Sequence, residues 1–141
     1  MRKITVSARA TKQLGQALGK RIKPGQILAL SGTLGSGKTT FVQGFARGLG
    51  IRHKIKSPTF VTFYFYPIPK TDLTLYHFDL YRLKNQAELR EIGFQEIIKN
   101  KNSVTVIEWP EKAKRILPAK TKWIYFNHEG KHSGIRIIRG A

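Results

Sequence analysis

The residues with the clearest capacity for chemistry lie in one run, residues 32–39, which reads Gly-Thr-Leu-Gly-Ser-Gly-Lys-Thr. This run fits the pattern G-x-x-x-x-G-K-[ST] without a gap. Its glycines let successive backbone N–H groups turn toward phosphate oxygens, and the helix that follows adds the positive end of its dipole. In this pattern Lys38 contacts the β- and γ-phosphates, and the Thr39 hydroxyl binds Mg²⁺. The run therefore predicts a site for a nucleoside triphosphate.

Two acids stand directly after apolar strands and could complete such a site. Asp79 follows residues 75–78, and Glu108 follows residues 104–107. A phosphate loop needs a carboxylate at the end of a neighbouring strand, where it holds the metal ion and its water. The chain has only eight acids, so two of them at strand ends favour a functional role. Residue type and spacing do not rank Asp79 against Glu108.

The elements that must position these residues alternate between strands and helices. The run at 27–31 is typical of a strand buried on both faces of a parallel sheet, and Ser7 can cap the first helix. The alternation predicts one α/β domain over residues 1–141, a P-loop NTPase-like domain with a central, mostly parallel sheet flanked by helices and a C-terminal β-hairpin. The expected strands are 4–6, 27–31, 59–66, 73–79, 104–107, 122–127 and 135–139, and the expected helices are 8–21, 38–49, 86–99 (broken at Gly93) and 111–116.

Charge is distributed unevenly along the chain. The sequence has 26 Lys and Arg against 8 Asp and Glu, a formal charge of +18, and every acid lies at or beyond Asp72. Such a surface attracts polyanions, so it indicates either a nucleic acid or partner-facing patch or a generally basic composition. The absence of cysteine excludes disulfides, thiolate catalysis and cysteine zinc sites. The chain shows neither a signal peptide nor an apolar run of about 20 residues, which predicts a cytoplasmic protein without membrane association.

Several other readings of the sequence are weaker. A GTPase would carry Asn-Lys-x-Asp, but residues 100–103 end in serine. A small-molecule kinase usually has a lid that carries several arginines, and the segments that could form a lid here are short. His128 and His132 straddle the turn expected at residues 129–130, which argues against a helical metal site. The aromatic segment 60–66 is first of all a core or sheet-edge strand, and a platform for stacking RNA bases is the alternative.

Four segments, in order and at matching spacing, resemble the TsaE family of bacterial tRNA threonylcarbamoyladenosine biosynthesis ATPases. They are residues 35–45, 56–60, 76–83 and 107–110. The run Tyr-His-Phe-Asp-Leu-Tyr-Arg together with Glu-Trp-Pro is far more specific than the phosphate loop. The similarity extends over essentially the whole chain.

The resemblance implies an ATPase that works with a TsaB–TsaD pair, which places threonylcarbamoyl on adenosine 37 of tRNA. It implies ATP and Mg²⁺ as cofactors, weak hydrolysis by this chain alone, and a monomer in the absence of its partners. It also implies roles for individual residues. Thr39 and Glu108 would ligate Mg²⁺, Lys38, Asp79 and Thr59 would serve catalysis with Glu108, and the nucleotide would contact Ser7, Thr11, Gly35, Ser36, Gly37, Lys38, Thr39, Thr40 and Trp109.

Three functions remain open from the sequence. The first is an ATPase component of a tRNA-modification complex, which could also contact tRNA directly through its basic surface. The second is a nucleotide or small-molecule kinase that uses the same loop. The third is a basic RNA-binding module whose nucleotide site is vestigial.

Overall fold

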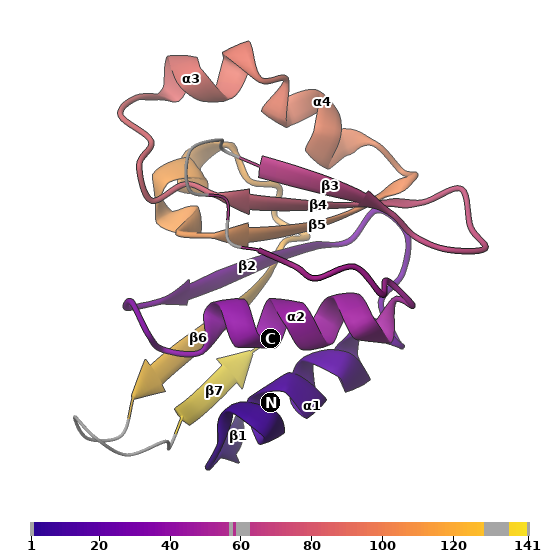
Figure 1. The fold of residues 1–141 in the computed structure, drawn as a ribbon. Coiled ribbons are helices and arrows are strands. Elements are labelled where there is room, and N and C mark those ends of the chain that lie inside the picture. Colours follow the sequence, from indigo (N-terminus) through magenta and orange to yellow (C-terminus); the bar gives the residue numbers. More distant parts are fainter. Residues whose placement is uncertain (1, 57, 59–62, 129–135, 141) are drawn as a thin grey trace.

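A seven-stranded sheet forms the centre of the molecule (Figure 1). The computed structural model describes residues 2–56, 58, 63–128 and 136–140. The strand order is β1-β7-β6-β2-β5-β4-β3. The strands are β1 (Arg2–Thr5), β2 (Ile27–Gly32), β3 (Phe63–Pro67), β4 (Thr74–Asp79), β5 (Ser103–Glu108), β6 (Lys122–His128) and β7 (Arg136–Gly140).

The four central strands are parallel and the outer strands are antiparallel. β2 pairs in parallel with both β5 and β6, and β4 pairs in parallel with β5. β3, β7 and β1 add antiparallel pairings at the two sides. The expected buried parallel strand is confirmed, since residues 27–30 of β2 are at most 1% exposed. The expected C-terminal hairpin is confirmed by the pairing of β6 with β7.

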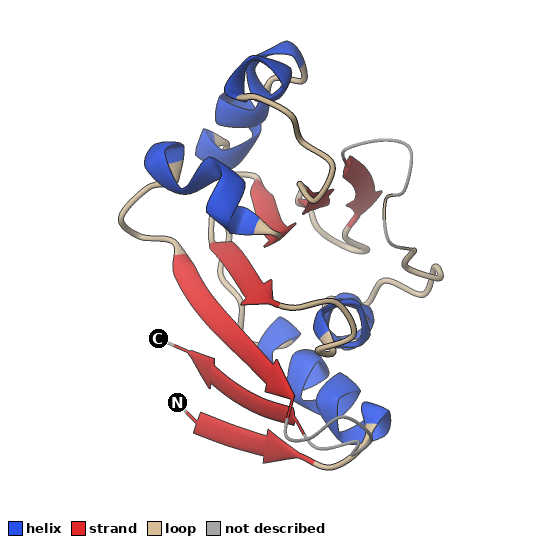
Figure 2. Ribbon diagram, turned by 90° about the vertical axis from the view of Figure 1, so that its left-hand side faces the viewer, coloured by secondary structure: helices blue, strands red, loops and turns tan. Residues whose placement is uncertain are grey.

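Helices cover both faces of this sheet (Figure 2). Along β2, Leu28 and Leu30 point to the face that carries α1 and α2, and Ile27 points to the opposite face. Side chains of a strand alternate between faces, which is why one short apolar strand serves both cores. The helices are α1 (Ala8–Gly19), α2 (Lys38–Gly48), α3 (Gln86–Glu91), α4 (Phe94–Lys99) and the 3₁₀ helix η1 (Pro110–Ile116).

Most expected elements occur within one or two residues of their predicted bounds, and three show differences in register, start or helix type. The first strand is Arg2–Thr5 instead of 4–6, because it is set by its pairing with β7. The third strand begins at Phe63, and residues 59–62 lie outside the described part of the chain. The helix expected at 111–116 is a 3₁₀ helix that begins at Pro110. The break at Gly93 is confirmed, since this residue has φ 72° and directly precedes α4.

Helices α1 and α2 lie unusually close together. A Cβ atom placed on Gly44 of α2 would lie 1.9 Å from the Lys12 carbonyl oxygen, and one on Gly15 of α1 would lie 2.2 Å from the Phe41 carbonyl oxygen. Such distances lie well inside van der Waals contact, so only glycine fits at these crossings. The close approach fixes α2, whose N-terminus follows the phosphate loop. Among the helices of the described residues, the longest has 12 residues, and none has the length and apolar character of a membrane span.

Candidate nucleotide site

The phosphate loop connects the end of β2 to the start of α2. Gly37, the residue before α2, has φ 100°, which is a left-handed conformation that side chains strongly disfavour. This turn lets the helix begin at Lys38 with its free N–H groups directed out of its first turn. A cavity of about 210 Å³ lies in front of the loop. Its lining residues are Leu34, Gly35, Gly37, Lys38, Thr39, Thr40, Asp79, Glu108 and Trp109.

Lys38 reaches back across the loop from the first position of α2. Its Nζ donates a hydrogen bond to the Gly32 carbonyl oxygen and lies 3.9 Å from the centre of the Trp109 ring. Burial lowers the pKa of this amine below its ordinary value of 10.5, and the nearby carboxylates Glu108, Glu111 and Asp79 oppose that shift. The folded protein therefore holds a cation that is partly deprived of water, which favours an anionic ligand beside it.

Glu108 is the most constrained acid of the site. It ends β5 and is 3% exposed. Its Oε1 accepts a hydrogen bond from the Thr39 hydroxyl at 3.2 Å, and its Oε2 lies 2.6 Å from Nε2 of His77. Both carboxylate oxygens therefore have partners, and the hydroxyl and the carboxylate that the sequence assigned to Mg²⁺ lie within one hydrogen bond of each other.

His77 is not among the site residues predicted from the sequence. In the parallel pair β4–β5 it lies opposite Val106, two residues before Glu108, so the two side chains are diagonal neighbours on one face. The ring is fully buried, and Nδ1 has no hydrogen-bond partner among the described residues. A donating Nε2–H fixes the carboxylate. An isolated histidine in an otherwise apolar strand, two residues before an acid, was the available signal.

Asp79 ends β4 directly beside Glu108. The two residues are partners in the parallel register, so two carboxylates meet at the same edge of the sheet. Asp79 is only partly buried and its Oδ1 accepts a hydrogen bond from the Tyr81 N–H at 3.0 Å. Two neighbouring carboxylates repel each other unless a cation lies between or beside them. The strand pairing thus brings together the two acids that the sequence selected independently.

Trp109 follows Glu108 and turns the chain sharply out of β5. Its φ of 57° places a bulky residue in the left-handed region, where strain is usual and where functional sites are over-represented. The ring packs against Tyr81 with centroids 4.9 Å apart and lies under the Lys38 amine. This arrangement forms an aromatic wall of the cavity.

Other residues predicted for the site lie elsewhere or outside the description. Ser7 caps α1 by accepting a hydrogen bond from the Ala10 N–H. The Thr11 hydroxyl lies 2.7 Å from that of Thr5, within the same N-terminal segment. Neither is among the residues that line the cavity at the loop, so their assignment to the nucleotide stays a prediction. Thr59 lies outside the described residues, as do the side chains of both histidines of the rejected metal motif, His128 and His132.

The residues present fit a phosphate group and a magnesium ion. Ser36 is fully buried in the loop, and its hydroxyl has no hydrogen-bond partner among the described residues. An unpaired buried hydroxyl of this kind is costly unless a ligand or water satisfies it. The donors are a hydroxyl and carboxylates, which are the oxygen ligands that Mg²⁺ prefers.

Comparison with known proteins agrees with the fold and the motifs. The family model described as "Threonylcarbamoyl adenosine biosynthesis protein TsaE" matches residues 5–137. The TsaE protein of Treponema pallidum is 41% identical over 86% of this chain and 87% of its own length, and that of Bacillus subtilis is 36% identical over 89% and 77%. The crystal structure of Bacillus subtilis YdiB superimposes with a TM-score of 0.77 at 32% identity, covering 98% of this chain and 82% of that one. The chain belongs to the TsaE family of tRNA threonylcarbamoyladenosine biosynthesis proteins.

Proposed function

We propose that this chain binds ATP with Mg²⁺ and hydrolyses it in the cytoplasm, as the ATPase partner of a TsaB–TsaD complex in tRNA threonylcarbamoyladenosine biosynthesis. The observation that carries the proposal is the contact between Thr39 and Glu108, 3.2 Å apart at the mouth of the phosphate loop. The family supports the pathway, and the loop supports the choice of a nucleoside triphosphate.

The side chains divide the work of hydrolysis among them. Lys38 and the backbone N–H groups of the loop hold the phosphate charge, and Thr39 and Glu108 hold the ion. Bound Mg²⁺ would neutralise charge on the phosphate oxygens. The Asp79 carboxylate accepts a hydrogen bond from the attacking water and orients it. We assign this role to Asp79 because Glu108, which contacts Thr39 and His77, is the acid that holds the ion, whereas Asp79 ends the neighbouring strand and lines the same cavity.

The first experiment measures ATP hydrolysis by this chain with and without a TsaB–TsaD pair. We expect slow turnover alone and a clear stimulation by the pair. Lys38→Ala should abolish the stimulated hydrolysis and tRNA modification together, because the phosphates lose their main cation. Intact hydrolysis and modification in this variant would refute the proposed mechanism. Phosphoryl transfer to a nucleoside or sugar in the same assay would instead identify a kinase.

Two further variants separate the acids. Asp79→Asn should retain Mg²⁺-dependent ATP binding and lose turnover. An uncharged amide oxygen accepts a hydrogen bond from the attacking water more weakly than a carboxylate does. Glu108→Gln should weaken the dependence of ATP binding on Mg²⁺, because a charged ligand is lost. Titration of a fluorescent ATP analogue with and without EDTA measures the binding of ATP and its dependence on Mg²⁺, and the hydrolysis assay measures turnover. If Asp79→Asn weakened the Mg²⁺ dependence and Glu108→Gln abolished turnover alone, Asp79 would be the Mg²⁺ ligand and Glu108 would orient the water.

A further inference from the structure

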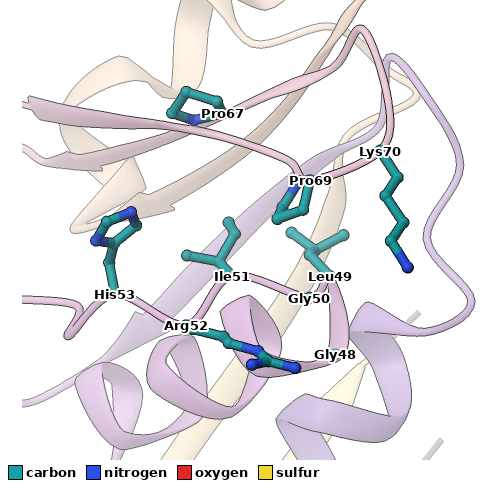
Figure 3. Close-up of a pocket in the computed structure, with 9 residues that line it drawn as sticks. All are labelled: Gly48, Leu49, Gly50, Ile51, Arg52, His53, Pro67, Pro69 and Lys70. Carbon is teal, nitrogen blue, oxygen red and sulfur yellow. The ribbon is translucent and has the colours of Figure 1, made fainter.

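Two further cavities lie at the C-terminal end of α2, and the proposed ATPase mechanism does not use them. The larger has a volume of about 840 Å³ and lies where α2 ends and the β3–β4 turn approaches it (Figure 3). A cavity of about 300 Å³ adjoins it, and the two share Arg52 and His53 as lining residues. Together they form one surface, which we call the α2-end groove. Its other lining residues are Lys12, Gln43, Arg47, Gly48, Leu49, Gly50, Ile51, Lys54, Ile55, Pro67, Pro69 and Lys70.

The groove combines an apolar floor with a cationic rim. Figure 3 shows Leu49, Ile51 and Pro69 within the larger cavity, with Arg52 and Lys70 at its margin. Pro67 and Pro69 are exposed and Leu49 is half-buried, whereas Ile51 is buried beneath them. The two prolines and Leu49 therefore offer apolar surface on which the faces of sugars and bases can pack. The rim offers charged donors, which suit phosphate oxygens.

The cations of the rim are not neutralised within the described protein. Arg47, Arg52, Lys54 and Lys70 are exposed, and among the described residues none of them forms an ion pair or a side-chain hydrogen bond. Asp72 follows Lys70 closely but does not line either cavity. The first 71 residues contain no carboxylate at all. A cluster of like charges is unfavourable in isolation and is relieved when a polyanion binds.

We propose that the α2-end groove binds the phosphate backbone of RNA, with tRNA as the RNA met in this pathway. The choice of tRNA rests on the proposed function, whereas the choice of a phosphate backbone rests on the groove itself. An acidic protein surface is the competing partner, but alternating anionic and flat apolar parts match a nucleic acid strand better than a carboxylate patch. RNA here would leave the phosphate loop free, because the 11 residues of α2 separate the two sites by about 16 Å.

The test compares two triple variants with identical loss of charge. The groove variant is Arg52→Ala, Lys54→Ala and Lys70→Ala. The control variant is Arg115→Ala, Lys120→Ala and Lys122→Ala, whose residues are also exposed and lie on η1, in the turn after it and at the start of β6. Fluorescence anisotropy with a labelled tRNA transcript gives the affinity at several salt concentrations. The wild type should show a steep dependence on salt.

The groove variant should bind tRNA about 100-fold more weakly at 0.1 M salt, and its log–log salt slope should be smaller by about 3. The control variant should lose less than about one unit of slope. Equal losses in the two variants would overturn the proposal, because binding would then follow net charge alone. Absence of tRNA binding by the wild type would also overturn it, and loss of TsaB–TsaD stimulation only in the groove variant would then assign the groove to a protein.

A parallel measurement keeps this proposal separate from the proposed function. Both triple variants should bind a fluorescent ATP analogue like the wild type, since their substitutions lie away from the phosphate loop. If the wild type failed to bind ATP while tRNA binding fell only in the groove variant, the ATPase proposal would fail and the groove would stand. If ATP binding were normal while tRNA binding fell equally in both variants, the groove proposal would fail and the ATPase proposal would stand.

Discussion

The chain uses glycine for two different physical reasons, one in the phosphate loop and one where α1 crosses α2. Gly37 is needed for its conformation, since its φ of 100° is one that side chains disfavour. Gly44 lies in an ordinary helix and is needed for its size, since a Cβ there would lie 1.9 Å from the Lys12 carbonyl oxygen. The loop builds the site and the crossing holds it in place, so substitutions at the two positions should change different properties.

The largest effect is expected from Gly44→Ala. The added methyl group meets backbone and not a flexible side chain, so the two helices must move apart. We expect the free energy of unfolding to fall by about 3 kcal/mol and the Tm by about 10 °C. Thermal and urea denaturation measure both quantities. ATP affinity of the folded protein should change far less than its stability.

Gly50→Ala is the matched control for that variant. Unlike Gly44, Gly50 has a positive φ, 87°, and nothing lies within 4 Å of the position of a Cβ. The cost should therefore be conformational alone, about 1 kcal/mol. Equal losses in Gly44→Ala and Gly50→Ala would show that the crossing tolerates a methyl group and that the comparison with the loop is wrong.

Gly37→Ala should lower ATP affinity more than stability, the opposite of Gly44→Ala. The left-handed turn becomes strained, and relaxation of the loop turns one or more N–H groups away from the phosphates. Because hydrogen bonds to charged groups contribute about 1.5–3 kcal/mol each, ATP affinity should fall about 10- to 100-fold. Calorimetric titration with ATP measures the affinity. The control is Thr33→Ala at an exposed position of the loop, and this variant should bind ATP like the wild type. A variant that lost stability but kept its affinity would contradict this account.

The phosphate loop and the α1–α2 crossing also differ in how well the sequence predicts them. The loop, its flanking strand and helix, and the two strand-end acids were predictable, because the motif encodes local conformation and parallel strands end at one edge. The crossing was not, since Gly15 and Gly44 read as weak helix formers until both helices are placed in space. The contact between His77 and Glu108 depends on strand register, which residue spacing along one strand does not reveal.

His77 gives a smaller effect that tests this unpredicted contact. His77→Leu removes the Nε2 donor that fixes Glu108, whereas His77→Gln keeps a donor of similar reach. We expect the Mg²⁺ concentration for half-maximal hydrolysis to rise about 10-fold in His77→Leu, with an intermediate value for His77→Gln. Measured hydrolysis across a Mg²⁺ series, together with Mg²⁺-dependent ATP binding, separates positioning from packing. Unchanged Mg²⁺ dependence in both variants, with only a lowered Tm, would reduce His77 to a core residue.

The smallest effect is expected for Lys38→Met, in the thermal stability of the protein measured without nucleotide. Burial lowers the pKa of the Lys38 amine, which means that the folded state disfavours the charged form relative to water. Methionine fills a similar volume without a charge to desolvate, although it gives up the hydrogen bond to Gly32 and the contact with Trp109. The two terms oppose each other, so the Tm should stay within a few degrees of the wild-type value while ATP binding is lost. A large fall in Tm would show that Lys38 stabilises the empty loop, and that the loop, like the helix crossing, is held mainly by its own contacts.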